Sequence, residues 1–231
     1  MIENKKVMED MVNLLDYDSV KDYLFMNVIN AEENRNMLND IPHTTIGDIA
    51  IIYRVLIKTT PEGIMSAKIT NEMMDAYGID VSKLHNDTLL SAPRLLPPSV
   101  NKIENVLNQD PSDVFSFHGE SNMFIISNEK FTDGASCIFY AGVLNDLASK
   151  LGRDLYVIPS STDECIAVCD NPDIDYHHLQ NTLQEINQFS CVGDKKLSDS
   201  LYHYDKHNHV LEKNDDYQKK IHKSKTEQLL N

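Results

Sequence analysis

Hydrophobic residues near the N-terminus recur every three or four positions, which is the spacing of one face of an α-helix. The first such stripe consists of Val7, Met8, Met11, Val12 and Leu15. After the polar break DYD, a second stripe that Asp18 can cap consists of Val20, Tyr23, Leu24 and Val28. A further short turn or helix is expected over AEENRNML. Residues 1–45 are therefore predicted to be a helical N-terminal region.

After residue 45 the pattern changes to short runs rich in Ile and Val, which favour β-strands. GDIAIIYRVLI (47–57) is predicted as one strand and IMSAKIT (64–70) as its half-buried partner. Two helices are expected next, one from an Asn71 N-cap to Gly78 and one from Ser82 to about Ala92. The three prolines of PRLLPPSV (93–100) predict an irregular stretch. Residues 46–100 are thus predicted to be a β-β-α-α unit.

The second half of the chain predicts a β-α-β-β-α-β unit over residues 101–211. MFIIS (123–127) is a strand, and one long helix is expected from Thr132 or Asp133 to Gly152. LYVIP and ECIAVC are predicted as two strands of a hairpin joined by the turn SSTD, followed by the helix YHHLQNTLQEINQ and the strand LSDSLYHYD. Residues 212–231 are polar and are predicted to be disordered.

Hairpin-linked strands mixed with helices indicate an α+β fold, with helices packed on a mainly antiparallel mixed sheet. We expect the 46–100 and 101–211 units to pack together as one domain. The chain of 231 residues has 41% hydrophobic residues, which is ordinary for one globular domain.

The formal net charge of −15 changes the range of expected partners. An acidic surface opposes binding to nucleic-acid phosphates and to anionic lipid, so neither nucleic acid nor membrane is expected as a partner. The carboxylates are scattered, which favours a solvated acidic surface over an acidic DNA mimic or antirestriction protein. The four cysteines, the absence of a signal-like start and the short apolar runs predict a cytoplasmic protein.

One polar cluster, PSSTDEC, raises the question of nucleophilic catalysis. Ser160 or Ser161 would need a base within reach, and His43 or His118 would have to be brought there by the fold. The glycines of a GxSxG elbow are missing, and serine and aspartate are also what a strand-to-strand turn prefers. Glu164 is explained by neither the turn nor the core, so it remains the main candidate for a functional role.

Metal chemistry has one weak candidate, in HYDKHNH. His203, His207 and His209 lie near Asp205, and imidazole with carboxylate can hold a metal ion. The alternative is a hairpin turn on DKHN, in which Asn208 takes the unusual backbone angle. Cys165 and Cys169 would be roughly 13 Å apart on one strand, too far for a disulfide or a shared zinc ion. We predict no cofactor.

Several strings together resemble a bacterial family named domain of unknown function 5688. They are LLDYDSVKDYLFMNVINAEENRNMLNDIPH, DIAIIYRV, AKITNEMMDAYGI, PRLLPPS, ISNEKFTDGASCIFY, LGRDLYVIPSSTDE and LSDSLYHYD, within residues 14–211. The resemblance implies a cytosolic α+β unit without an established activity. It also implies that an N-terminal segment of the family is missing here, which could leave a sheet edge open to a partner strand.

The residues that match the family pattern are His43, Asn71, Asn128, Gly134, Pro159, Ser160, Ser161, Glu164 and Asp205. Family members often carry His at the position of Asp163, which weakens an acid–base role there. We hypothesise a non-enzymatic protein-interaction or regulatory module whose partner is another protein. The alternative is a small hydrolase or ligand-binding protein that uses Ser160, Ser161 and Glu164.

Overall fold

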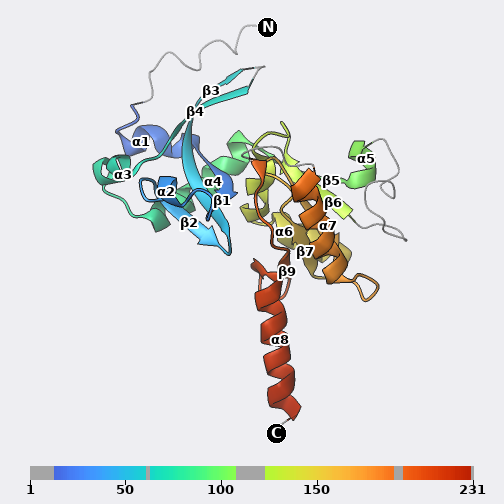
Figure 1. The fold of residues 1–231 in the computed structure, drawn as a ribbon. Helices are drawn as coiled ribbons and strands as arrows, with labels where there is room; N and C mark the ends of the chain where they lie inside the picture. The colour runs from blue at the N-terminus through green and yellow to red at the C-terminus, as the bar shows by residue number, and fades with distance from the viewer. Residues whose placement is uncertain (1–12, 61–62, 108–122, 190–194, 230–231) are drawn as a thin grey trace.

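The computed structural model describes residues 13–60, 63–107, 123–189 and 195–229, and these residues form two antiparallel β-sheets with helices packed on them (Figure 1). The predicted α+β class is confirmed. The described helices include none that is both long enough and apolar enough to cross a lipid bilayer.

The first sheet is built around one long strand that is rich in Ile and Val. Its strands are β1 (Leu24–Asn30), β2 (His43–Ile46), β3 (Ile49–Thr60) and β4 (Gly63–Lys68). β3 lies in the centre and pairs antiparallel with each of the other three. Its first five residues are buried on both faces of the sheet. Beyond this part, β3 continues with β4 as a two-stranded ribbon.

Four short helical elements and one longer helix accompany the first sheet: α1 (Tyr17–Val20), η1 (Lys21–Tyr23), α2 (Arg35–Leu38), α3 (Asn71–Tyr77) and the longer α4 (Val81–Leu95). Gly78 ends α3 in the left-handed conformation, as predicted. The N-caps differ from those predicted. The Thr70 side chain accepts the backbone N–H of Met73, and the Asp80 side chain accepts that of Lys83.

The prediction of a helical N-terminal region is wrong for Leu24–Asn30, which is strand β1. Each residue of β1 pairs with a residue of β3, from Leu24 opposite Val55 to Asn30 opposite Ile49. This long-range pairing overrides the local helical pattern. The predicted stripe from Val7 to Val12 lies outside the described residues.

The second sheet has the strand order β10-β9-β7-β8-β6-β5, and all its described pairings are antiparallel. The strands are β5 (Pro98–Lys102), β6 (Met123–Asn128), β7 (Leu155–Ile158), β8 (Cys165–Cys169), β9 (Tyr202–Asp205) and β10 (Val210–Lys213). The helices are α5 (Ile103–Leu107), η3 (Gly134–Phe139), α6 (Val143–Leu151), α7 (Tyr176–Phe189) and α8 (Asn214–Leu229). The predicted hairpin over the SSTD turn is confirmed as β7–β8.

Alternating side chains of the second sheet contribute to two cores. One face, which includes Val157 and Cys165, packs with α6, η3 and the first sheet. The opposite face, which includes Ile158 and Ile166, packs against Leu179 of α7. All three described cysteines are buried free thiols, as expected for small core residues.

The two sheets are also joined by polar contacts around Asp48, in the turn between β2 and β3. Its carboxylate accepts hydrogen bonds from the hydroxyls of Ser198 and Ser200. The Tyr202 hydroxyl lies 2.7 Å from the same carboxylate, and Lys213 forms a 2.9 Å ion pair with it. LSDSLY, a string of the family resemblance, therefore anchors the second sheet on the first.

Three further predictions are wrong in physically instructive ways. Helix α4 continues through Pro93, and β5 begins at Pro98, so 93–100 is not irregular. Pro98 is tolerated because β5 is the last strand in the order of its sheet. The long helix over 132–152 is broken into η3 and α6 by Gly142, which has a φ of 88°. Asp133 occupies the N-cap position of η3 with a left-handed φ of 52°, but its side chain makes no capping hydrogen bond.

The prediction of disorder over 212–231 is wrong for the described residues, because 212–213 complete β10 and Asn214–Leu229 form helix α8, which leaves the body of the molecule as a stalk (Figure 1). Asn214, at the start of α8, is buried, and its N–H donates to Leu201 O. Ion pairs of Lys219 with Asp216 and of Lys220 with Glu212 support its first turns.

Candidate functional site

The SSTD turn binds mostly to itself and to its neighbours. Ser160 is buried, and its hydroxyl donates to Glu164 O at 3.0 Å. The Ser161 hydroxyl accepts the backbone N–H of Asp163 at 3.1 Å. These are the local contacts that stabilise a turn connecting two strands.

Asp163 fixes this turn to the start of η3. Its carboxylate accepts the N–H of Asp133 at 3.0 Å and pairs with Lys195. Its backbone carbonyl accepts the N–H of Gly134 and the hydroxyl of Ser127. Gly134 has no space for a side chain, because an added Cβ would collide with that hydroxyl and with the Asn128 backbone.

Glu164 is half-buried beside this cluster. Burial, and then the neighbouring Asp163, raise the pKa of Glu164 above its ordinary value. Among the described residues, no hydrogen bond or ion pair involves its carboxylate. Burial followed by Asp163 also raises the pKa of Asp133. The two carboxyls share an environment that disfavours their charged forms.

The histidines proposed as bases are placed as follows. His43 is on β2 in the other sheet, where its Nδ1 lies 3.0 Å from Ile41 O. His118 lies outside the described residues. The described hydrogen bonds of the Ser160 and Ser161 hydroxyls are made within the turn, and none of them involves a histidine.

The predicted turn on DKHN is confirmed between β9 and β10. Asp205 accepts the N–H groups of His207 and Asn208 at 2.8 and 2.9 Å. The residue in the left-handed conformation is His209, with a φ of 55°, and not Asn208 as predicted. His209 contacts the Tyr204 hydroxyl at 3.3 Å, beside a separate cavity of about 430 Å³.

His203 joins a different set of potential ligands from the one predicted. Its Nε2 lies 3.4 Å from Asp170 Oδ2 and 3.8 Å from Asp154 Oδ2. One ligand atom from each of these three side chains lies within 4.8 Å of the others, and no other such group of His, Cys, Asp and Glu occurs in the described part of the chain. Neither His207 nor His209 belongs to it.

The β7–β8 hairpin places the two carboxylates side by side. Asp154 directly precedes β7, Asp170 directly follows β8, and Leu155 pairs with Cys169 in the register. The backbone N–H of Asp170 donates to Asp154 O at 2.9 Å. His203 comes from β9, which pairs with β7. Asp154 and Asp170 thus meet at the open end of the β7–β8 hairpin, and His203 lies beside them on the neighbouring strand, opposite Tyr156.

Aromatic rings enclose the imidazole of His203. The ring of Tyr217, in the first turn of α8, stacks on it with centroids 3.6 Å apart and planes at 12°. Tyr156 contacts it edge-on at 5.5 Å. Burial, followed by the charge of Asp170, raises the pKa of Tyr156. His203 is fully buried, and its Nδ1 has no hydrogen-bond partner among the described residues.

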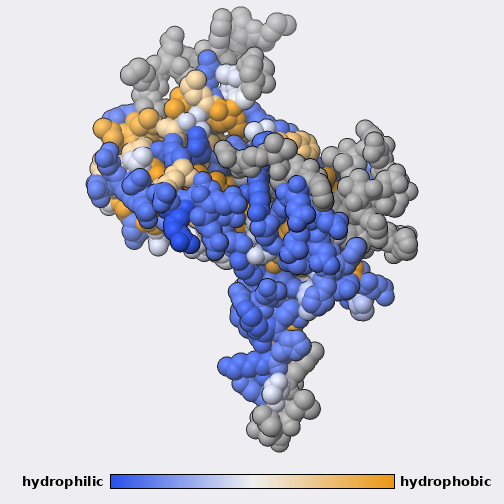
Figure 2. Space-filling model, viewed as in Figure 1, coloured by the Kyte–Doolittle hydropathy of each residue, from blue (hydrophilic) through white to orange (hydrophobic). Residues whose placement is uncertain are grey.

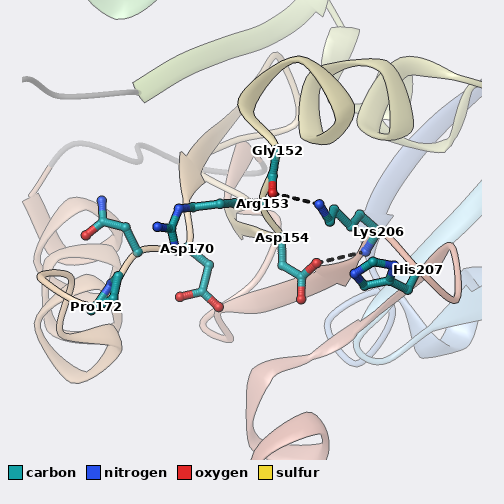
Figure 3. Close-up of a pocket in the computed structure, with 8 residues that line it drawn as sticks. Gly152, Arg153, Asp154, Asp170, Pro172, Lys206 and His207 are labelled. Carbon is teal, nitrogen blue, oxygen red and sulfur yellow. Dashed lines mark hydrogen bonds between the residues drawn. The ribbon is translucent and has the colours of Figure 1, made fainter.

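Asp154 and Asp170 face a cavity of about 400 Å³, so the two carboxylates are reachable from outside (Figure 3). Arg153, Lys206 and His207 also line this cavity. The N–H of Lys206 donates to Asp154 Oδ1, and its ammonium donates to Gly152 O. The three groups could hold a small cation or act as an acid–base set.

Sequence reasoning missed Asp154 and Asp170, although a signal was present. The predicted hairpin already implied that residues 154 and 170 meet at its open end. The position of β9 beside β7 could not be read from the local pattern.

Comparison with curated proteins and with solved structures finds no match. Comparison with protein-family models matches residues 1–206 with the family of unknown function DUF5688. The match begins earlier and ends earlier than the 14–211 region of resemblance. Since it covers most of the 231 residues, the chain belongs to the DUF5688 family.

Proposed function

We propose that this chain is a non-enzymatic, cytoplasmic protein-interaction module that binds an extended segment of a partner protein along β4. The observation that carries the proposal is the edge of the first sheet. β4 pairs with β3 on one side, and the described residues contain no strand on its other side. A free strand edge offers backbone donors and acceptors to an added strand.

The surface beside this edge includes apolar side chains that are exposed or only partly buried. Met65 on β4 is 58% exposed, and Leu56 and Ile64 of the same ribbon are only partly buried. Figure 2 shows hydrophobic surface at the end of the molecule where the β3–β4 ribbon lies, while much of the rest of this face is hydrophilic. Exposed apolar surface with a polar surround is typical of protein-binding sites.

The two alternative functions, a small hydrolase and an acidic DNA mimic, have less support from the described contacts. The hydroxyls of Ser160 and Ser161 make hydrogen bonds within the turn, which favours the interaction module over a hydrolase that uses these serines. Several carboxylates form separate ion pairs with lysines in different parts of the chain, such as Asp87 with Lys83 on α4 and Asp216 with Lys219 on α8. Such scattered pairing favours a solvated acidic surface over the dense rows of a DNA mimic.

The test uses a photo-crosslinking amino acid at position 65 of the full chain, expressed in cells, with the same amino acid at position 90 as control. Leu90 on α4 is 71% exposed, so it matches Met65 in exposure and apolar character. We expect one protein to crosslink at position 65 and not at position 90. Purified, it should bind the wild type and lose affinity for Met65→Glu but not for Leu90→Glu.

A strand-adding partner contributes an extended segment, so crosslinks should map to one short stretch of its sequence. No specific crosslink at position 65, together with a purified chain that stays a stable monomer, would overturn the proposal. Equal losses of affinity for the two Glu variants would also overturn it, since they would show nonspecific adhesion.

A further inference from the structure

We infer that Asp154, Asp170 and His203 together bind one divalent transition-metal ion of the Zn²⁺ class. Bonds of about 2.0–2.2 Å to a shared ion place two ligand atoms roughly 3.0–3.5 Å apart in tetrahedral or octahedral geometry. The distances from His203 Nε2 to the two aspartates, 3.4 and 3.8 Å, are close to this separation. Small side-chain movements would complete the geometry.

The state of His203 supports this inference independently. A fully buried imidazole needs strong polar partners, because burial removes its contacts with water. Nδ1 of His203 has no hydrogen-bond partner among the described residues, and the hydrogen bond of Nε2 with Asp170 is long at 3.4 Å, with Asp154 farther away at 3.8 Å. A metal bond at Nε2 supplies the strong interaction that the ring otherwise lacks.

An imidazolium–carboxylate ion pair without metal explains the geometry less well. Charge-assisted N–H···O bonds are typically 2.7–2.9 Å long, and both His203 contacts are clearly longer. The gap between the three groups is better explained by a bound ion.

The surroundings provide support for one ligand and a route of entry. The N–H of Lys206 holds Asp154 Oδ1, which leaves Oδ2 directed toward His203. Both carboxylates line the cavity of Figure 3, so an ion can reach them and keep coordination positions open to that cavity. Lys206 directs its ammonium to Gly152 O.

The ligand set indicates the class of metal. Imidazole with two carboxylates suits Zn²⁺, Mn²⁺ or Fe²⁺, whereas Mg²⁺ and Ca²⁺ prefer ligand sets made of oxygen atoms alone. Metal-bound histidines usually donate their second N–H to an acceptor, and its loss typically weakens binding 10–100-fold. Since Nδ1 of His203 has no such acceptor among the described residues, we expect moderate affinity.

The test is calorimetric titration of the purified, chelator-treated full chain with ZnCl₂ and, separately, with MgCl₂. We expect one Zn²⁺ per chain, and much weaker binding of Mg²⁺. Asp154→Asn and Asp170→Asn remove a charge but keep side-chain shape, so they should preserve folding, as circular dichroism would verify. Each should weaken Zn²⁺ binding at least about 100-fold, beyond the usual cost of losing a supporting contact.

Two matched controls complete the design. Asp173→Asn makes the same charge change at an exposed position three residues from Asp170, and His207→Ala removes a histidine of the cavity wall. Both should bind Zn²⁺ like the wild type. Absence of stoichiometric binding, or equal losses in controls and ligand variants, would overturn the site. The measurement needs no partner protein, so its failure is distinct from failure of the β4 proposal.

Discussion

The hydroxyl of Tyr202 lies 2.7 Å from a carboxylate oxygen of Asp48, a residue 154 positions earlier in the chain. The same hydroxyl accepts the N–H of Asp48 and lies 2.8 Å from Ile46 O. Both residues belong to the contacts that join the two sheets. Their arrangement makes stability depend on a few polar groups whose removal can be measured.

Tyr202→Phe should lower the free energy of unfolding by about 1–3 kcal/mol, because Asp48 loses a buried partner for its N–H and for its carboxylate. Urea denaturation would measure the change. Tyr204→Phe on the same strand is the control, since its hydroxyl makes only a 3.3 Å contact with His209. Similar losses for the two variants would contradict the role of the Asp48 contact.

The acid stability of the protein should depend on Asp48. Burial raises the pKa of this carboxyl, but the hydrogen bonds from Ser198, Lys213, Tyr202 and Ser200 outweigh burial and lower it below the ordinary value. Ionised Asp48 therefore stabilises the folded chain above about pH 4, and this stabilisation is lost as pH falls through the folded-state pKa.

Urea midpoints between pH 5 and pH 2 would test this dependence. Asp48→Asn should be less stable than the wild type at pH 5 and should show a flatter decline below about pH 4. Asp75→Asn, at an exposed position of α3, should follow the wild-type curve. Parallel curves for Asp48→Asn and the wild type would refute the expectation.

Gly47→Ala should destabilise the protein more than Gly78→Ala does. Both glycines have a φ of 62°, so alanine costs about 1–2 kcal/mol of backbone strain at either position. An added Cβ at Gly78 meets open space, whereas at Gly47 it would collide with the Tyr202 hydroxyl and with Lys213. Thermal unfolding should show a larger drop in melting temperature for Gly47→Ala than for Gly78→Ala. Equal drops would show that the contact between Gly47 and Tyr202 tolerates the extra atom.

Glu164→Gln should stabilise the protein at pH 7 but not at pH 3. Burial, and then Asp163, raise the pKa of Glu164 in the folded chain, so stability is lost as pH rises through that pKa. Glutamine removes the poorly solvated charge, while at pH 3 both side chains are neutral. Urea midpoints at the two pH values would measure the effect, with exposed Glu129→Gln as the control. An equal difference between Glu164→Gln and the wild type at pH 7 and at pH 3 would contradict the prediction.

Bound Zn²⁺ should protect α8 from trypsin. The ion would fix the plane of the His203 ring, on which Tyr217 of α8 is stacked. Cleavage at Lys219, Lys220 and Lys223 should therefore slow when ZnCl₂ is added. Asp170→Asn should be cleaved at one rate with or without zinc. Slowing in this variant too would indicate an effect of zinc on the protease.

Local patterns were sufficient to predict some elements and misleading for others. The β7–β8 hairpin could be predicted because the SSTD turn and its flanking apolar runs are local features. β1 was missed because Val20, Leu24 and Val28 are four residues apart, a spacing compatible with both a helix face and one face of a strand. Only pairing with β3, which comes later in the chain, decides between them.

The candidate site could be predicted only in part, for a similar reason. His203 was a candidate from sequence, and the hairpin brings Asp154 to Asp170. The contact between these parts requires β9 to pair with β7 across the intervening α7, which no short stretch encodes. The formation of helix α8 likewise depends on distant contacts that the local sequence does not encode. Asn214 donates its N–H to Leu201 O, and Tyr217 stacks on His203 of the second sheet.

The contact between Asp48 and Tyr202 also has a consequence for the timing of folding during synthesis. The first sheet is complete at Lys68, but its buried face packs with residues of the second half, including Ile126 and Val157. At about 5–20 residues per second, roughly 8–30 s separate the synthesis of Asp48 from that of Tyr202, 154 residues later. During this interval the apolar face of the first sheet has none of the second-half residues that later cover it, so its burial waits for the end of synthesis.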